Sequence, residues 1–570
     1  MNATEQKNKM VIYQVFPRWF GNDCPSPVKD GGLTENGVGK FSAFTPLALQ
    51  KIKELGVTHV WYTGVIEHAT KTDYTQYGIR KDHSAVVKGK AGSPYAIKDY
   101  YDIDPDLADK VPNRMKEFEA LVTRTHEAGL KMIIDFVPNH VARQYFSDAR
   151  EPYVEDLGQH DNVSKAFDVN NNFYYLPGQT LSFRFDPQRE EDYAYSEFPA
   201  KVTGNNHFDA HPSQNDWYET IKLNYGVDYM NGGVCHFEEI PDTWHKMLQI
   251  LFFWAKKGID GFRCDMAEMV PVEFWEWAIP QVKQEADVVF IAEVYNPAEY
   301  RNYIHKGHFD YLYDKVGLYD TVRAVMCGQQ SAAAISDCWK SVSDIQEHML
   351  NFLENHDEQR VASDFFARDA RLGVPGMIVA AAMNVNPVMI YCGQELGEPG
   401  MDEEGFSGKD GRTTIFDYWS IKRLRDWRNG GRFDGLTLDP DARSLRKDYQ
   451  RLLNAVSSEP VIGKGKFYDL MYANTQNPRF NINKQYAFLR KYENEVLLVV
   501  ANFDRADQNV WVNIPADAFK ALGFEDNRPA TVTDLLTGTK AISTLTDAYP
   551  YQVQLPAYAG RLLKFTFLEA

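Results

Sequence analysis

The chain has 570 residues, of which 44% are hydrophobic, and a formal net charge of −18. This length and composition predict a soluble globular protein with a large buried core and several domains. The negative charge is spread along the chain rather than gathered in one tail, which disfavours a nucleic-acid partner.

The six cysteines lie far apart, without a Cys-x-x-Cys pair or a Cys/His pair at zinc spacing. Neither a disulfide framework nor a zinc site is therefore expected. The first ten residues are polar and lead directly into a strand-like segment, which is unlike a signal peptide, and no apolar run is long enough to cross a membrane. We expect a cytoplasmic protein with no membrane partner, although a chain whose export signal had been removed would have the same features.

The first 140 residues repeat a unit in which an apolar strand is followed by an amphipathic helix and a glycine. Thr45 and Pro46 are typical of a helix N-cap and first helical position. A second helix is predicted at residues 113–128 and ends at Gly129. The strands of this region are predicted at residues 11–16, 58–63 and 131–137. Such an alternation predicts a parallel α/β sheet.

Residues 141–240 interrupt this repeat. They are rich in Asn, Asp, Tyr and Phe and too long for an ordinary loop, so we expect a small irregular β subdomain. The repeat then resumes with helices at residues 241–257 and 373–383. Five more strands are predicted at residues 259–262, 288–292, 309–313, 349–353 and 387–391. Eight strands alternating with helices predict a closed (β/α)8 TIM barrel.

The pattern changes again beyond residue 400. A long acidic, glycine-rich loop leads to helical segments that end near Ser457, and alternating segments from about residue 466 predict an antiparallel β domain. This domain is expected to pack against the barrel. The expected domains are the barrel at residues 1–140 and 241–465, the insertion at residues 141–240, and the C-terminal β domain at residues 466–570.

The C-terminal ends of barrel strands usually carry the function, and three acids of this chain follow predicted strands there. Asp265 follows the fourth strand, Glu293 the fifth and Asp357 the seventh. Arg263 lies one residue from Asp265 on the same face, and its guanidinium favours the charged carboxylate. That pair alone indicates no more than a salt bridge, whereas three acids at separate strand ends indicate one functional site.

Two chemistries could use these residues. In glycoside hydrolysis, Asp265 would be the nucleophile, and Glu293, in an apolar setting that favours its neutral form, would be the acid/base. In a metal-dependent hydrolase, His140, His356 and nearby aspartates would be ligands, and a chelator would abolish activity. Spacing alone does not separate the two.

Four segments in order resemble the signature motifs of glycoside hydrolase family 13, the α-amylase family. They are DFVPNH at residues 135–140, GFRCDMA at 261–267, the glutamate of FIAEV at 293, and ENHD at 354–357. The insertion resembles the family's domain B and the terminal β domain resembles its domain C, so the resemblance covers essentially the whole chain.

The resemblance implies retaining hydrolysis of α-1,4-glucosidic bonds in starch- or glycogen-type glucans or malto-oligosaccharides, through a covalent glycosyl-enzyme intermediate. Asp265 would be the nucleophile and Glu293 the acid/base. Asp357 would bind hydroxyls of the distorted sugar and stabilise the transition state.

The resemblance also implies four substrate-binding residues. Arg263 would position the nucleophile, and Tyr95 would stack beneath the sugar in the cleavage subsite. His140 and His356 would donate hydrogen bonds to that sugar. The expected partner is therefore an α-glucan or oligosaccharide, while the oligomeric state is left open.

Several positions depart from the family pattern. Glu268 and Met269 stand where many members carry Lys and His, so we expect a different leaving-group recognition. Lys222 stands where the fifth family motif carries Asp, which disfavours the usual calcium site, although Asn139 occupies a ligand position. No cofactor is expected to be required, and a structural calcium ion is left open. The acidic loop after the eighth strand matches no specificity class.

Two other functions remain as alternatives. A family 13 transglycosidase or isomerase would use the same three acids and differ in water access. A non-catalytic relative that serves as a binding or assembly partner typically lacks one or more of the acids, and all three are present here. Linkage preference, chain length and endo or exo action are not predicted.

Overall fold

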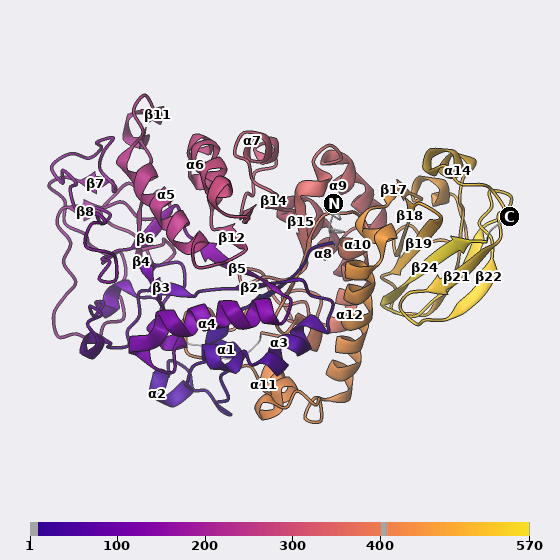
Figure 1. Ribbon diagram of the computed structural model, residues 1–570, viewed down its shortest axis with the longest axis horizontal. Coiled ribbons are helices and arrows are strands. Elements are labelled where there is room, and N and C mark those ends of the chain that lie inside the picture. Colours follow the sequence, from indigo (N-terminus) through magenta and orange to yellow (C-terminus); the bar gives the residue numbers. More distant parts are fainter. Residues whose placement is uncertain (1–8, 401–405, 407, 569–570) are drawn as a thin grey trace.

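The computed structural model describes residues 9–400, 406 and 408–568 (Figure 1). Part of the acidic stretch noted above, residues 401–405 and 407, lies outside the described residues. No helix within the described ranges is both long enough and apolar enough to cross a bilayer.

The predicted (β/α)8 barrel is confirmed. Eight strands close into a barrel in the order β1-β16-β15-β14-β13-β12-β5-β2, and every neighbouring pair is parallel. The strands are β1 (Val11–Val15), β2 (His59–Tyr62), β5 (Lys131–Phe136), β12 (Gly261–Cys264), β13 (Val289–Ala292), β14 (Tyr311–Tyr313), β15 (Met349–Phe352) and β16 (Val388–Tyr391).

One strand is displaced from its predicted position. The apolar run predicts a strand at residues 259–262, but β12 extends through Arg263 to Cys264. Arg263 lies beside Asp135 of β5 in the parallel register, at the end of the barrel where polar side chains are tolerated inside. The prediction ended the strand before Arg263 because a charged residue is unusual in a buried strand.

Helices surround the barrel (Figure 1). As predicted, Thr45 caps the first long helix, because its hydroxyl oxygen accepts a hydrogen bond from the Ala48 amide at 3.1 Å. The principal helices are α3 (Pro46–Lys53), α4 (Arg114–Glu127), α5 (Asp242–Ala255), α6 (Val272–Glu285), α7 (Tyr300–His305), α8 (Asp320–Met326), α10 (Gly373–Ala382) and α12 (Pro440–Ser458).

The barrel interior is filled by alternate residues of its strands. These side chains form a separate buried cluster that includes Ile12, Trp61, Ile133, Ile291, Tyr313, Leu350, Phe352 and Met389. Because side chains alternate along each strand, the next inward positions place polar groups above this layer, at the C-terminal mouth.

The insertion between β5 and β12 consists of short two-stranded sheets, at the end of the molecule opposite the C-terminal domain (Figure 1). Its strands are β6 (His140–Ala142) with β9 (Thr220–Lys222), β7 (Tyr175–Leu176) with β8 (Ala200–Lys201), and β10 (Val227–Asp228) with β11 (Val234–Cys235). A further hairpin, β3 (Ile66–His68) with β4 (Ile97–Ile103), precedes the insertion and was not predicted.

The C-terminal domain contains a six-stranded antiparallel sheet in the order β17-β18-β19-β24-β21-β22 and a smaller pair, β20 with β23. The strands are β17 (Lys466–Asp469), β18 (Gln485–Tyr492), β19 (Glu495–Asn502), β20 (Gln508–Val512), β21 (Ala530–Asp534), β22 (Lys540–Ser543), β23 (Tyr551–Leu555) and β24 (Ala559–Phe567). Buried Arg490 of β18 donates a hydrogen bond to the Ala382 carbonyl at 2.9 Å, which ties this sheet to α10.

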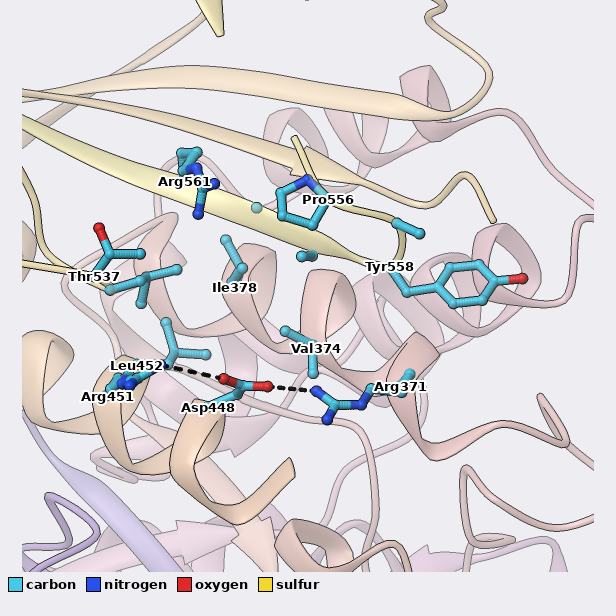
Figure 2. A pocket seen from close by; sticks show the side chains of 14 residues that line it. Arg371, Val374, Ile378, Asp448, Arg451, Leu452, Thr537, Pro556, Tyr558 and Arg561 are labelled. Atoms are coloured by element: carbon cyan, nitrogen blue, oxygen red, sulfur yellow. Dashed lines mark hydrogen bonds and ion pairs between the residues drawn. The ribbon is translucent and has the colours of Figure 1, made fainter. Parts of the chain in front are cut away.

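A pocket of about 300 Å³ lies between α10, α12 and the C-terminal domain (Figure 2). Asp448 forms ion pairs with Arg371 and Arg451 on one side of it, and Tyr558 and Arg561 line the other. The pocket contains none of the three acids predicted to be catalytic, so it is a feature of the domain junction.

Candidate active site

The mouth of the barrel brings the predicted acids together around one arginine. Arg263 Nη1 lies 2.8 Å from Asp265 Oδ1, and Arg263 Nη2 lies 2.9 Å from Glu293 Oε2. Asp357 joins the group through His356, whose Nε2 lies 3.1 Å from Asp357 Oδ2. Tyr95 contacts His356, and His140 lies beside Asp265. The seven predicted site residues therefore lie in one network.

A fourth carboxylate, Asp135, belongs to this network. Its Oδ1 lies 3.4 Å from Arg263 Nη1, and its Oδ2 accepts a hydrogen bond from Trp61 Nε1 at 2.9 Å. Burial raises the pKa of Asp135 to about 6, although Arg263 and Trp61 oppose the rise. The sequence places Asp135 at a strand end but does not indicate this contact with Arg263.

The charge on Arg263 is shared among Asp135, Asp265 and Glu293, all of which are buried. Burial raises the pKa of Asp265 above its usual value; Arg263 opposes this rise, and Glu293 and Asp357 add to it. The guanidinium therefore favours the charged form of Asp265 less than the Arg-x-Asp spacing alone predicts. Because one guanidinium is shared by several acids, the titration of Asp265 is coupled to that of its neighbours.

Glu293 lies among donors rather than in the apolar setting expected from the sequence. Besides Arg263, its carboxylate accepts hydrogen bonds from the Met266 amide, at 2.8 Å, and from the Tyr295 hydroxyl. The apolar residues before it face the barrel interior and the surrounding helices, so they do not enclose the carboxylate. Met266 has a φ of 43°, and this left-handed turn directly after Asp265 accompanies the contact of its N–H with Glu293.

His356 is held as a neutral donor. Burial lowers its pKa well below the usual value, and the positive charge of Arg263 adds to the effect. The Gln14 amide nitrogen lies 2.8 Å from His356 Nδ1, so Nδ1 accepts and Nε2 carries the proton. That Nε2 lies 3.1 Å from Asp357 Oδ2 and 2.6 Å from the Tyr95 hydroxyl, and the Tyr95 ring stacks on the imidazole at 5.1 Å.

His140 approaches the nucleophile candidate from the insertion side. It begins β6, and its Nε2 lies 4.0 Å from Asp265 Oδ2. Burial lowers its pKa to about 3, helped by the charge on Lys222, so the imidazole is neutral near pH 7. The ring of half-buried Trp217 lies 5.1 Å away, whereas four other aromatic residues of the insertion are buried: Phe173, Tyr174, Tyr175 and Tyr218.

The residues at the expected calcium position do not fit a cation. Lys222 is buried in β9, opposite His140, and its Nζ donates a hydrogen bond to Asn139 Oδ1 at 2.6 Å. Asn139 Nδ2 in turn donates to the Gly204 carbonyl at 2.8 Å. The lysine amine thus already contacts the oxygen that would bind calcium, and its protonated form would repel a second cation there.

On the leaving-group side, Glu268 and Met269 belong to a short 3₁₀ helix, η7 (Ala267–Met269). Glu268 Oε2 accepts a hydrogen bond from the Asn296 amide at 3.0 Å, in the loop after β13. Glu268 thus contacts the loop after β13, and a leaving-group recognition that differs from the family pattern stays a prediction.

Sequence reasoning missed four supporting residues: Gln14, Trp61, Tyr295 and Tyr313. Tyr313 accepts a hydrogen bond from Arg263 Nε at 3.1 Å, and the other three contact His356, Asp135 and Glu293 as described. Three of the four lie on barrel strands, and no motif marks them. For these three residues, the only indication in the sequence was that side chains alternate along a strand, so that every second one points into the barrel.

Two family models match the chain. The α-amylase catalytic domain matches residues 14–426, and the C-terminal domain of maltogenic amylase matches residues 479–562. Alpha-amylase 3 of Dictyoglomus thermophilum is 24% identical over 530 residues, covering 87% of this chain and 85% of that protein. The human protein named amino acid transporter heavy chain SLC3A1 is 24% identical over 320 residues. The match covers 55% of this chain and 35% of that protein.

Solved structures share the fold. The maltogenic α-amylase AmyB of Thermotoga neapolitana has a TM-score of 0.62 and 18% identity, covering 98% of this chain and 99% of its own. The α-amylase of Geobacillus thermoleovorans, solved with acarbose, has a TM-score of 0.62 and 19% identity, covering 99% of each chain.

Proposed function

Because the chain belongs to the α-amylase family of glycoside hydrolases, we propose that it hydrolyses α-1,4-glucosidic bonds of glucans or malto-oligosaccharides with retention of configuration. The observation that carries this proposal is the position of two acids on one guanidinium, with Asp265 and Glu293 on its two terminal nitrogens. Such carboxylates lie close together, which suits the separation of about 5 Å in retaining enzymes better than the roughly 6.5–9.5 Å of inverting ones.

In the first step, a carboxylate oxygen of Asp265 attacks the anomeric carbon and Glu293 gives its proton to the departing glycosidic oxygen. The bond to that oxygen breaks as the glycosyl-enzyme bond forms. In the second step, Glu293 takes a proton from water, which attacks the same carbon and releases Asp265. Arg263 contacts both carboxylates and holds them in one geometry throughout.

Asp357 is suited to sugar hydroxyls. Its side chain is 45% exposed, unlike the carboxylates on Arg263, and His356 Nε2 fixes one of its oxygens. The neutral His356 and His140 donate hydrogen bonds without adding charge beside the developing oxocarbenium ion. Tyr95 supplies a ring beneath the sugar, and its orientation is set by the stacked His356.

No metal is required at the Asn139 position in this proposal, because the Lys222 ammonium already contacts the amide oxygen. Each of the three acids has a role in hydrolysis, and neither His140 nor His356 is left over as a ligand. These two features disfavour the metal-dependent alternative.

Product analysis tests the proposed function. The enzyme is incubated with maltoheptaose, starch, pullulan or sucrose, and the products are separated by chromatography. Shorter malto-oligosaccharides with retained anomeric configuration, observed by NMR before mutarotation, are expected from maltoheptaose. Longer oligosaccharides or rearranged sucrose would instead identify a transglycosidase or isomerase, and the absence of turnover on all four would favour a non-catalytic relative.

A further inference from the structure

A second cluster of carboxylates lies in the β3–β4 hairpin and the beginning of the insertion. Glu67 belongs to β3, Asp99 and Asp102 belong to β4, and Asp148 lies in the loop after β6. One oxygen from each of the four lies within 4.8 Å of the others. The cluster shares no residue with the acids around Arg263.

The cluster is buried on one side and open on the other. Glu67, Asp99 and Asp102 have exposed fractions of 1%, 0% and 3%, whereas Asp148 is exposed. An ion from solvent can therefore reach the three buried carboxylates past Asp148. The arrangement provides both an enclosed set of oxygens and an entry path.

Two of the buried acids are oriented by hydrogen bonds. Asp99 Oδ1 accepts from the Tyr101 amide at 2.8 Å, and Asp99 Oδ2 accepts from the Asp148 and Ala149 amides at 2.9 and 3.0 Å. Arg114 forms a two-nitrogen ion pair with Asp102, with Nε 2.9 Å from Oδ1. These contacts fix the direction of each carboxylate.

Glu67 is different, because neither of its carboxylate oxygens has a hydrogen-bond partner among the residues that the structure describes. Buried polar oxygens with no hydrogen-bond partner are costly to the folded state. Within the described ranges, Arg114 is paired with Asp102, and Lys98, whose charge also acts on Glu67, is paired with Asp82 at 3.0 Å. These two cations are fewer than the four carboxylates of the cluster.

We propose that Glu67, Asp99, Asp102 and Asp148 bind one divalent cation, and that calcium fits best. Calcium takes oxygen ligands at about 2.3–2.6 Å, so ligands of one ion lie no more than about 5 Å apart, in agreement with the 4.8 Å limit here. All four ligands are hard carboxylates, which disfavours zinc, and magnesium usually keeps several waters rather than four carboxylates. The ion would tie the β3–β4 hairpin to the insertion and stabilise the fold.

Metal binding by the full-length protein tests this proposal. After treatment with EDTA and removal of the chelator, the protein is titrated with Ca²⁺ or Mg²⁺, bound metal is measured by mass spectrometry, and thermal unfolding is followed. We expect one Ca²⁺ per chain and a thermal midpoint that rises more with Ca²⁺ than with Mg²⁺. Glu67→Gln and Asp148→Asn should each weaken Ca²⁺ binding by more than about tenfold.

Glu151→Gln is the matched control, because Glu151 is an exposed acid three residues from Asp148 and outside the cluster. It should bind Ca²⁺ as the parent does. Asp148 is exposed, so its variant should fold even if substitution of Glu67 disturbs the core. Two outcomes overturn the proposal: Ca²⁺ binding undiminished in both cluster variants, or no Ca²⁺ binding by the parent.

The expected role is structural, so kcat measured at a temperature well below both midpoints should be the same with and without Ca²⁺. This readout separates the proposal from the proposed function. An enzyme that binds Ca²⁺ at the cluster and fails to hydrolyse glucans would contradict the proposed function alone.

Discussion

Replacing Lys222 with methionine tests whether a buried lysine with a lowered pKa stands at the expected calcium position. Lys222 is buried, its Nζ lies 2.6 Å from Asn139 Oδ1, and burial lowers its pKa to about 7. Methionine retains an unbranched apolar side chain of similar length and removes the charge and the donor. The substitution therefore isolates the contribution of the ammonium group.

The magnitude follows from the two protonation states. An unfolded lysine has a pKa of about 10.4, so from about pH 7 to pH 10 the unfolded chain binds one more proton at this position than the folded chain. The stability contributed by Lys222 then rises by about 1.4 kcal/mol per pH unit in that window, and below about pH 7 it is constant at its lowest value. The methionine variant lacks this dependence. Its loss of the contact with Asn139, about 1–3 kcal/mol, is a separate cost.

The free energy of unfolding is measured by chemical denaturation at pH 6, 7, 8 and 9 for the parent and for Lys222→Met. The free energy of unfolding of the parent minus that of the variant should change little between pH 6 and 7. It should increase by roughly 2–3 kcal/mol from pH 7 to pH 9. Lys165→Met, which removes an exposed lysine from the same insertion, is the control and should give a difference that does not vary with pH. A pH-independent difference for Lys222→Met would refute the reasoning.

The remaining predictions concern the acids and the substrate. Asp265→Ala and Glu293→Gln should each lower kcat on maltoheptaose by roughly 10³-fold or more, with unchanged circular dichroism; near-normal turnover by either would contradict its assignment. Asp135→Asn should lower kcat about tenfold with little change in KM, because Asp135 is paired with Arg263, which holds the two acids, and a pure KM effect would argue against this role. Trp217→Ala should raise KM for maltoheptaose by about tenfold at similar kcat, a loss of the size expected for one stacked ring, and an unchanged KM would place Trp217 outside the substrate path. EDTA should leave turnover at 25 °C intact, whereas inactivation reversed by Ca²⁺ would show that catalysis needs the metal.

The fold was largely predictable because its elements follow local rules. All eight barrel strands occur where apolar runs alternate with helices, and each observed strand begins and ends within about two residues of its prediction. The β3–β4 hairpin was missed because its strands are separated by a long connection of mostly polar residues without a turn motif. The predicted position of β12 was wrong because a charged residue such as Arg263 is unusual inside a buried strand unless acidic residues pair with it, as they do at the barrel mouth.

The site was predictable where it coincides with motifs and unpredictable elsewhere. Gln14 fixes the tautomer of His356 across 342 residues of sequence, and Trp61 binds Asp135 across 74. Such pairs depend on closure of the barrel, which no local pattern encodes. The same closure made Arg263 a partner of three carboxylates, so its effect on Asp265 could not be judged from their spacing.

The loops after β12 and β13 hold each other through two reciprocal hydrogen bonds. The Met266 amide donates to Glu293 Oε2 at 2.8 Å, and the Asn296 amide donates to Glu268 Oε2 at 3.0 Å. Each loop thus supplies a backbone N–H to a carboxylate of the other. Because Met266 directly follows Asp265, this arrangement fixes the nucleophile and the acid/base candidates relative to one another. A change at Glu268 would therefore act on the geometry of the two acids, because it would remove one of the two hydrogen bonds that hold these loops together.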